Sequence, residues 1–306
     1  MEGNILKYAI GIDIGGTNSR VALVDENLNL VERVQFPTDA QDPFVTMDKI
    51  AETIKSFDKP IVGIGVSCPG PLDLKAGSII STPNLGEKWW GVNIPQTIEE
   101  RTGIPAWLEN DANLAALAEA VVGEGKDRNY VQFFTISTGV GSGQVINKKI
   151  YNGAHGFAHE VANCIMWKEG PAHGSIIPGG IEAIASGTAI TKRAQKAGLD
   201  LVHAGQVNDL ANAGNETAQK IMDEAKEYLA NFIATVIAIT DPEIIILGGS
   251  VACKIDGFVD DLQERVVKKV FPPLKPYVNL RKTTLNEDSG LLGAAYLAFS
   301  NAKEEA

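Results

Sequence analysis

Apolar and polar residues alternate along the chain in short blocks that predict strands and helices by turns. Three apolar runs near the N-terminus predict three strands, and the next run has apolar residues at helical spacing until Pro60 closes it. In the first part of the chain the predicted strands are 8–14, 19–24, 30–36, 61–66 and 106–108, and the predicted helices are 43–57, 96–102 and 112–122. Strands that alternate with helices indicate an α/β protein whose sheet is covered by helices.

The same pattern then begins again. A strand over 130–137 is followed by a second glycine turn, 138–143, and by strands at 144–146 and 149–151. This repetition predicts an internal duplication, with chance as the alternative. The glycine-rich stretch 153–187 is predicted to be a long functional loop. The remaining predicted elements are helices at 188–198, 219–240 and 290–299, and a buried strand at 243–247 that ends in a third glycine turn, Gly248–Ser250.

Composition narrows the class of protein. With 306 residues, 44% of them hydrophobic, the chain can form two lobes, each with its own core. A formal net charge of −11 disfavours nucleic acid and anionic membranes as partners. The three cysteines form no disulfide framework, no apolar run has the length of a membrane span, and residues 1–7 are too short and polar for a signal peptide. We therefore expect a cytoplasmic enzyme.

The first glycine turn, Gly11–Asn18, is a candidate phosphate site. An apolar strand ends at Asp13, and Gly15, Gly16 and Thr17 follow. Glycines let backbone N–H groups approach a phosphate, and a nearby carboxylate can hold Mg²⁺, here through water. The turn lacks the Gly-Lys-Ser/Thr of a Walker A loop, and an ordinary hairpin turn is the alternative. Three such turns together favour a nucleoside triphosphate, ATP, contacted also by Thr138, Gly139, Gly248 and Gly249.

Four segments carry a family resemblance: Asp13-Ile-Gly-Gly-Thr17, Glu109-Asn-Asp-Ala-Asn113, Ser137-Thr-Gly-Val-Gly-Ser-Gly143 and Glu182-Ala-Ile-Ala-Ser-Gly187. In this order they resemble the ROK family of bacterial sugar kinases and repressors. The resemblance implies the actin-like, hexokinase-like ATPase fold, with two ribonuclease-H-like lobes and a cleft between them. The lobes would be residues 1–117 plus 288–306, and residues 118–287. It also implies a homodimer.

Asp111 is the candidate catalytic base, because it lies where a short predicted strand gives way to a helix. The alternative is that Asp111 only caps that helix. The resemblance implies that Asp111 activates the 6-hydroxyl group of a sugar and that Asn110 beside it binds the sugar.

A sugar presents a ring of hydroxyl groups, which carboxylates and amides bind well. The resemblance places four further residues at the sugar: Asn84, Glu160, Asn163 and Glu182. The two glutamates could instead be solvated loop charges. Trp89 and Trp90 could shape a second sugar subsite, although tryptophans more often only pack.

The chain also departs from the family. A histidine and three cysteines of the family hold a structural zinc, but here the histidine position is Asn163, and no cysteine lies between Cys164 and Glu182. Cys164 and His173 cannot supply four ligands, so we expect no zinc. The change at Asn163 also leaves the identity of the sugar open.

Two rival functions remain. His155-x-x-x-His159-Glu160 is close to the motif of zinc hydrolases, although Gly153 and Gly156 weaken the helix that motif needs. A sugar-responsive repressor would need a DNA-binding domain ahead of the first strand, where only seven residues stand. The sequence therefore predicts an ATP- and Mg²⁺-dependent hexose kinase acting on the 6-hydroxyl group, with glucose as the first candidate. An N-acylated mannosamine or a β-glucoside is the alternative substrate.

Overall fold

The chain folds into two compact units, each with its own sheet. The computed structural model describes residues 6–82 and 84–304. Unit 1 contains the chain up to Val122, the segment Asn152–Ala158 and the residues from Leu285 onward; unit 2 contains Gly123–Tyr151 and His159–Thr284. The sequence analysis assigned the segment Asn152–Ala158 to the other lobe.

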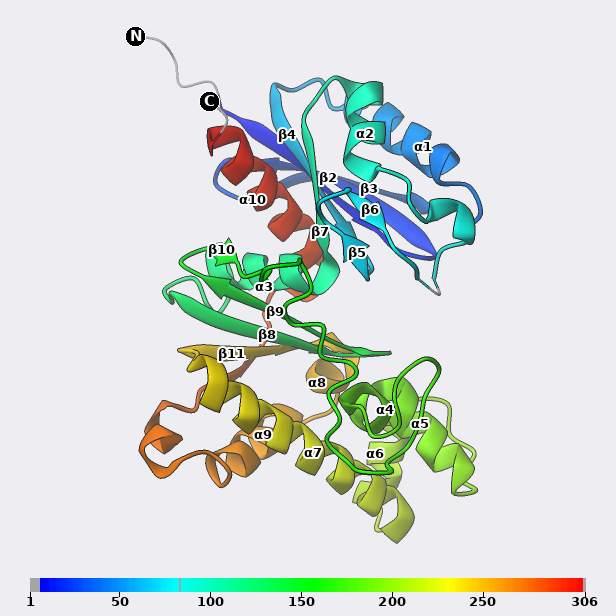
Figure 1. The fold of residues 1–306 in the computed structure, drawn as a ribbon, viewed down its shortest axis with the longest axis vertical. Coiled ribbons are helices and arrows are strands. Elements are labelled where there is room, and N and C mark those ends of the chain that lie inside the picture. The colour runs from blue at the N-terminus through cyan, green and yellow to red at the C-terminus, as the bar shows by residue number, and fades with distance from the viewer. Residues whose placement is uncertain (1–5, 83, 305–306) are drawn as a thin grey trace. The chain divides into compact units, whose positions relative to one another are not determined.

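The sheet of unit 1 has five strands in the order β3-β2-β1-β4-β7 (Figure 1). Strand β1 pairs antiparallel with β2 and parallel with β4, β2 pairs antiparallel with β3, and β4 pairs parallel with β7. The strands are β1 (Tyr8–Ile14), β2 (Asn18–Asp25), β3 (Leu30–Pro37), β4 (Ile61–Cys68) and β7 (Ala106–Asn110). A small two-stranded sheet is formed by β5 (Leu72–Asp73) and β6 (Ser78–Ile79).

Helices cover both faces of this sheet. Figure 1 shows α10 on one side and α1 with α2 on the other. On β1, Ile10, Ile12 and Ile14 belong to the same core cluster as α1, while Ala9 packs with α10. The helices are α1 (Pro43–Ser56), α2 (Ile94–Thr102), α3 (Asp111–Val121) and α10 (Ser289–Glu304), with 3₁₀ turns at Glu87–Trp89 and Asn286–Asp288.

Small residues let α10 lie against the backbone of the sheet. A Cβ atom at Gly11 of β1 would lie 2.1 Å from the carbonyl oxygen of Leu291, and one at Gly65 of β4 would lie 1.9 Å from that of Ala294. Any side chain at these two positions would therefore push the helix away.

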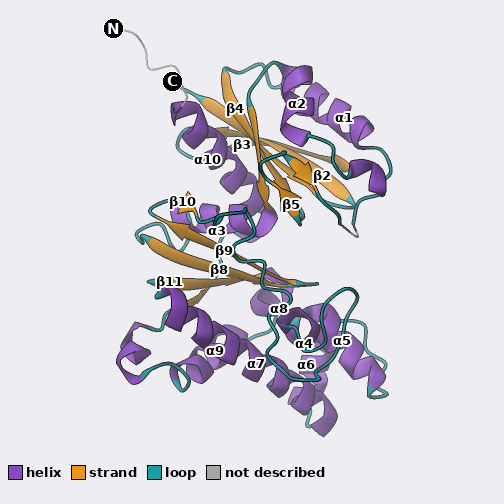
Figure 2. Cartoon of the chain, in the orientation of Figure 1, coloured by secondary structure: helices purple, strands orange, loops and turns teal. Residues whose placement is uncertain are grey.

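Unit 2 repeats the topology of unit 1. Its sheet has the order β10-β9-β8-β11-β12, with β8 antiparallel to β9 and parallel to β11 (Figure 2). The strands are β8 (Tyr130–Ile136), β9 (Val140–Ile146), β10 (Lys149–Ile150), β11 (Ile244–Gly248) and β12 (Leu280–Lys282). The predicted duplication is confirmed, because in both sheets the first, fourth and fifth strands are parallel, the second is antiparallel to the first, and the third is antiparallel to the second.

One long helix, α7, supports the core of unit 2. Its apolar residues pack in a single cluster with β8 and β11, and it ends at Thr240 with Asp241 as its C-cap, just before Pro242, as predicted. The helices of this unit are α4 (Ile181–Ala185), α5 (Gly187–Lys196), α6 (Ala204–Asn212), α7 (Glu216–Thr240), α8 (Gly249–Lys254) and α9 (Phe258–Val267), with a 3₁₀ segment at Pro272–Tyr277. The sequence analysis did not identify α4, α6, α8, α9 or β12.

The second glycine turn is shorter than predicted. The N–H group of Ser137 donates to the carbonyl oxygen of Gly139 at 2.9 Å, and β9 begins at Val140. Gly141 and Gly143 pair with Thr135 and Phe133 in the ladder. The prediction of a turn over 138–143 was therefore wrong for residues 140–143, which belong to strand β9 although two of them are glycines.

None of the described helices combines the length and apolarity that crossing a bilayer requires.

Candidate active site

Polar side chains of unit 1 gather at the carboxyl ends of three neighbouring parallel strands. Asp13 of β1 pairs in register with Ser67 of β4, and Ser67 pairs with Glu109 of β7. One residue further, Cys68 pairs with Asn110. Ligands of open α/β sheets bind at this edge, so the register alone brings these groups to a candidate site.

Asp111 is the first residue of α3, and Asn110 is its cap. The Oδ1 atom of Asn110 accepts hydrogen bonds from the N–H groups of Ala112 at 2.9 Å and Asn113 at 3.4 Å. The alternative that Asp111 caps this helix is therefore wrong. Its exposed carboxylate lies at the positive end of the helix and accepts from the N–H group of Ala112 at 2.8 Å.

The predicted base Asp111 and the predicted Mg²⁺ residue Asp13 both influence the buried thiol of Cys68. Desolvation raises the pKa of Cys68 well above its usual value, and the negative charges of Asp111 and Asp13 add to the rise. The thiol therefore stays protonated and is no nucleophile.

Arg20 holds one oxygen of Asp13. Its Nη2 atom lies 2.5 Å and its Nε atom 3.1 Å from Oδ2. The other oxygen borders a small space over Gly290 of α10, where a Cβ atom would lie 3.9 Å from Oδ1 of Asp13 and 3.7 Å from Oγ of Ser67. The Ser67 hydroxyl is fully buried and has no hydrogen-bond partner among residues 6–82 and 84–304. This space is the part of the site whose oxygen donors suit a hard cation.

The first glycine turn lies against Asn84. The N–H group of Gly15 donates to the carbonyl oxygen of Asn18 at 3.0 Å, which closes the turn around exposed Thr17. A Cβ atom at Gly16 would lie 2.6 Å from the carbonyl oxygen of Asn84. The structure thus brings a residue predicted to bind ATP into contact with one predicted to bind sugar.

The predicted subsite at the tryptophan pair is wrong for Trp89. Its side chain is fully buried, and its Nε1 atom donates to the carbonyl oxygen of Asp39 at 3.1 Å. Trp90 is 41% exposed. Trp89 is a core residue, because its indole N–H finds an internal partner.

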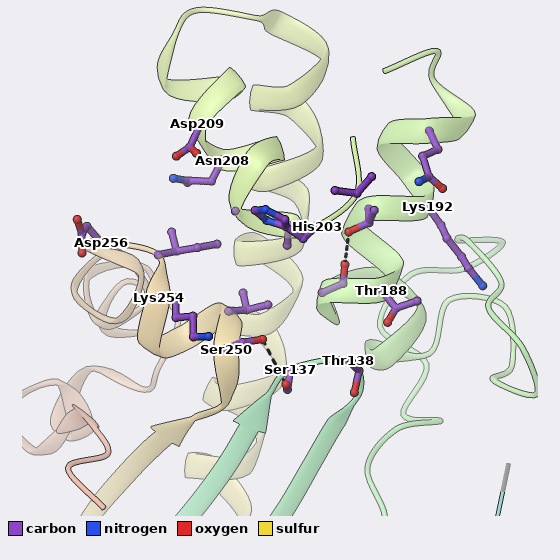
Figure 3. A pocket seen from close by; sticks show the side chains of 18 of the residues that line it. Ser137, Thr138, Thr188, Lys192, His203, Asn208, Asp209, Ser250, Lys254 and Asp256 are labelled. Atoms are coloured by element: carbon purple, nitrogen blue, oxygen red, sulfur yellow. Dashed lines mark hydrogen bonds between the residues drawn. The ribbon is translucent and has the colours of Figure 1, made fainter. Parts of the chain in front are cut away.

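Unit 2 contains a cavity of about 810 Å³ (Figure 3). Thr138, which was predicted to bind ATP, lines the cavity just after β8. Beside it, Oγ of Ser137 lies 3.2 Å from Oγ of Ser250. Figure 3 shows Lys254 on α8 and His203 with Asn208 on α6 at its walls. Besides Ser137, Thr138 and Ser250, the charged and polar residues of the lining are Thr188, Thr191, Lys192, Gln195, His203, Asn208, Asp209, Asn212, Lys254 and Asp256.

Sequence reasoning missed most of these lining residues. They lie on α5, α6 and α8, and the last two helices were not predicted. The apolar residues Ala204, Val207 and Ala211 do recur at helical spacing in α6. Because two of the three are alanines, this signal was weak.

Three glycines that were predicted to bind ATP lie at the strand ends beside the cavity but are not among the residues that line it. Gly249 has a φ of +84°, and a Cβ atom there would lie 2.5 Å from the carbonyl oxygen of Ile136. A Cβ atom at Gly248 would lie 2.7 Å from the ring of Phe133. These glycines allow β11 and β8 to end close together.

The third of these glycines, Gly139, faces Glu182. The Oε2 atom of Glu182 accepts from the N–H group of Val140 at 2.9 Å, and a Cβ atom at Gly139 would lie 2.6 Å from that oxygen. Glu182 was predicted to bind the sugar, and its carboxylate therefore also holds the turn that was predicted to bind the nucleotide. A change at one of these residues is transmitted to the other.

For the hexose-kinase reaction predicted from the sequence, Gly139→Ala is expected to lower kcat/KM about 100-fold, because the new methyl group displaces the Glu182 carboxylate by about 1 Å from the Val140 N–H group. The measurement is ADP release as hexose and ATP are varied separately, with circular dichroism to verify folding. A folded variant with normal values for both substrates would contradict the coupling.

Glu160 and Asn163 occupy the irregular segment of unit 2. Glu160 is exposed, yet partial desolvation by the surrounding loop raises the pKa of its carboxyl. Asn163 accepts from the N–H group of Ile177 at 2.8 Å through Oδ1. Asn163, which occupies the family's histidine position, thus joins two parts of its loop through a hydrogen bond from Ile177.

The zinc-hydrolase alternative is wrong, because residues 155–160 form turns and no helix. His159 has a φ of +70° and packs edge-on against the ring of Tyr151, and burial lowers its pKa. No group of three or more histidine, cysteine, aspartate or glutamate residues suited to a metal occurs in the described part of the chain.

The repeated sheets define an α/β protein with the actin-like ATPase fold, as predicted. A ROK hexokinase from Thermus thermophilus superposes with a TM-score of 0.88 at 30% identity, covering 97% of this chain and 99% of that one. A ROK glucokinase from Streptomyces griseus, solved with glucose and AMPPNP, gives a TM-score of 0.77 at 25% identity, covering 96% and 99%.

The sequence profile of the ROK family matches residues 9–301, and the chain belongs to that family. A glucokinase from Thermotoga maritima is 31% identical, over 94% of this chain and 95% of that protein. An N-acetylmannosamine kinase from Citrobacter koseri is 34% identical, over 94% and 98%.

Proposed function

We propose that the chain is an ATP-dependent hexose kinase that transfers the γ-phosphoryl group to the 6-hydroxyl group, with glucose as the first candidate. Its class is that of the sugar-kinase phosphotransferases, because relatives of that activity align over almost the whole chain. An N-acylmannosamine or a β-glucoside is the alternative substrate. The glucokinase and the N-acetylmannosamine kinase differ little in identity to this chain, so similarity alone favours neither sugar.

The position of Asp111 carries the proposal. Its exposed carboxylate begins α3, and the cap of that helix is Asn110, although Asp111 also accepts from the N–H group of Ala112. In the proposed reaction Asp111 accepts the proton of the sugar hydroxyl. The hydroxyl oxygen bonds to the γ-phosphorus, and the bond to the β–γ bridging oxygen breaks to leave ADP.

Mg²⁺ fits the small space over Gly290. Oδ1 of Asp13 borders it together with the buried hydroxyl of Ser67, which has no partner within residues 6–82 and 84–304, and both are oxygen donors of the kind that Mg²⁺ prefers. Asp13 would hold the ion, most simply through water, while Arg20 fixes the other carboxylate oxygen. Bound Mg²⁺ would neutralise phosphate charge. Gly16 and Thr17 would supply N–H groups to the phosphates, and Gly15, whose own N–H group closes the turn on Asn18, would line the same turn.

ATP is the proposed ligand of the unit 2 cavity. Its volume of about 810 Å³ lies within the range of about 300–1,000 Å³ that is typical of small-molecule sites. Lys192 and Lys254 supply positive charge, and Asn208 with Asp209 supplies donors and acceptors for the base or ribose. The proposed nucleotide contacts at the strand ends are Thr138, Gly139, Gly248 and Gly249.

The proposed sugar contacts are Asn84, Asn110, Glu160, Asn163 and Glu182, with Asp111 at the reacting hydroxyl. Asn163 and Glu182 each use one oxygen on a backbone N–H group, which fixes their orientation. Fixed amide and carboxylate groups select among sugars by the hydroxyl groups they can pair.

Asp13→Asn is expected to raise the Mg²⁺ concentration for half-maximal rate about tenfold, because a neutral amide replaces the carboxylate beside the cation. The measurement is a Mg²⁺ titration of ADP release at fixed ATP and hexose. Glu52→Gln is the control, since it removes the same charge from an exposed position of α1. If both variants titrate like the unchanged protein, Asp13 has no part in the metal site.

The proposed function is tested with a panel of hexoses, N-acylhexosamines and β-glucosides in one ADP-release assay, with the phosphorylated position identified by NMR. We expect 6-phosphorylation, fastest with glucose. Absence of sugar-dependent ADP release across the panel would refute the proposal. A faster reaction with a hexosamine or a disaccharide would replace glucose with that substrate. We further propose a cytoplasmic homodimer, which light scattering and cell fractionation can test.

A further inference from the structure

A buried carboxylate lies two residues before the proposed base. Glu109, near the end of β7, is 3% exposed. Its Oε1 atom accepts from the N–H group of Asn110 at 2.8 Å and from Nδ2 of Asn113 at 2.9 Å, and its Oε2 atom accepts from Nδ2 of Asn152 at 2.8 Å. Burying a charge is costly unless donors surround it, and here three donors do.

The three donors come from separate parts of unit 1. Asn110 is the cap of α3, Asn113 belongs to its first turn, and Asn152 begins the segment Asn152–Ala158. Nδ2 of Asn113 also donates to Oδ1 of Asn152 at 3.2 Å. Glu109 therefore joins the strand end, the start of α3 and a segment distant in sequence.

The carboxylate sets the orientation of these amides. Oδ1 of Asn113 is buried and has no partner in the described part of the chain, whereas its Nδ2 points to Glu109. Burial raises the pKa of the Glu109 carboxyl, and the hydrogen bonds from Asn113, Asn110 and Asn152 oppose the rise. The backbone of Asn110 and the side chains of Asn113 and Asn152 thus all donate to the Glu109 carboxylate.

We propose that Glu109 is a positioning residue that fixes the orientation of Asp111. It binds the N–H group on one side of Asp111, at Asn110, and the side chain on the other side, at Asn113. Asp111 lies between two anchored residues, so its carboxylate is held where the hydroxyl group must arrive. An error of about 1 Å in such a position can cost about 100-fold in rate. This inference rests on the proposed role of Asp111.

The test is Glu109→Gln, which keeps the shape but turns one acceptor into a donor. That donor faces the Nδ2 group of Asn152 or of Asn113, so one contact is lost. We expect kcat to fall 10- to 100-fold, with the KM for ATP changed less than twofold. Glu119→Gln is the control, because it neutralises a different buried carboxylate, on α3, and should leave kcat unchanged.

A double variant distinguishes positioning from folding. When Glu109→Gln is combined with Asn152→Asp, the new amide donates to the new carboxylate, and that carboxylate can still accept from Nδ2 of Asn113. We expect kcat to return to within about fivefold of the unchanged protein. The proposal is overturned if Glu109→Gln keeps full kcat, or if the double variant regains the melting temperature without regaining kcat.

Two further variants, Asn152→Ala and Asp111→Asn, are measured in the same assay. If Glu109→Gln does not fold, Asn152→Ala is measured instead; it should lower kcat about fivefold, and an unchanged kcat would overturn the proposal. Asp111→Asn is run in the same assay. If Asp111→Asn keeps its turnover, the proposed base is wrong; if only the Glu109 variants keep theirs, the base stands and the positioning role fails.

Discussion

Asp111→Asn is expected to lower kcat about 10³-fold, because the amide cannot accept the proton of the sugar hydroxyl as the phosphoryl group is transferred. The substitution preserves the shape of the residue and leaves the cap at Asn110 in place. Binding of the sugar should change little, since the role of the carboxylate is to accept a proton in the transition state.

The measurement combines turnover by ADP release with sugar affinity by calorimetry. Asp48→Asn is the control: it removes an aspartate charge from the surface of the same unit, where Asp48 pairs with Arg101. Turnover of Asp111→Asn within tenfold of normal would exclude Asp111 as the base. A large loss of sugar affinity with normal turnover would make it a binding residue only.

Gly293→Ala is expected to lower the free energy of unfolding by about 3 kcal/mol, which is the upper end of the usual cost of overpacking. A Cβ atom at Gly293 of α10 would lie 2.0 Å from the carbonyl oxygen of Leu114 in α3. Neither backbone can yield easily, because α10 also rests on Gly11 and Gly65 of the sheet.

The measurement is thermal unfolding, where about 3 kcal/mol corresponds to a fall of about 6 °C in a chain of this size. Gly290→Ala is the matched control on the same helix, because its Cβ atom would meet its neighbours only at ordinary contact distances of 3.7 Å and more. Equal melting temperatures for the two variants would show that the contact of α10 with α3 is not rigid.

Much of the architecture could be predicted from the sequence, because its signals are local. Alternating apolar runs marked the first three strands, and Pro242 marked the end of α7. The strand with a glycine turn occurred twice, and the two sheets have the same topology. By contrast, α6 was missed, because its buried face is partly alanine and gives a weak periodic signal.

Motifs also identified residues better than they identified roles. Asp111 and Asn110 stood out in sequence, but only the structure shows that Asn110 is the cap. Trp89 was a plausible sugar contact until its burial and its bond to Asp39 placed it in the core. The glycines Gly139 and Gly249 suggested phosphate contact, and the structure adds that each avoids a clash with a distant residue.

By itself the sequence determined the family and the order of the strongly patterned elements, and it singled out Asp13 and Asp111 as candidate site residues, because these depend on residue type and on spacing along the chain. The tertiary structure alone decided which groups meet: Asp13 with Arg20 and the space over Gly290, Glu182 with Val140, and Glu109 with Asn152. The physical reason is that hydrogen bonds and close contacts act over a few ångströms, whereas most of these partners, Asp13 and Arg20 excepted, are dozens of residues apart in the chain.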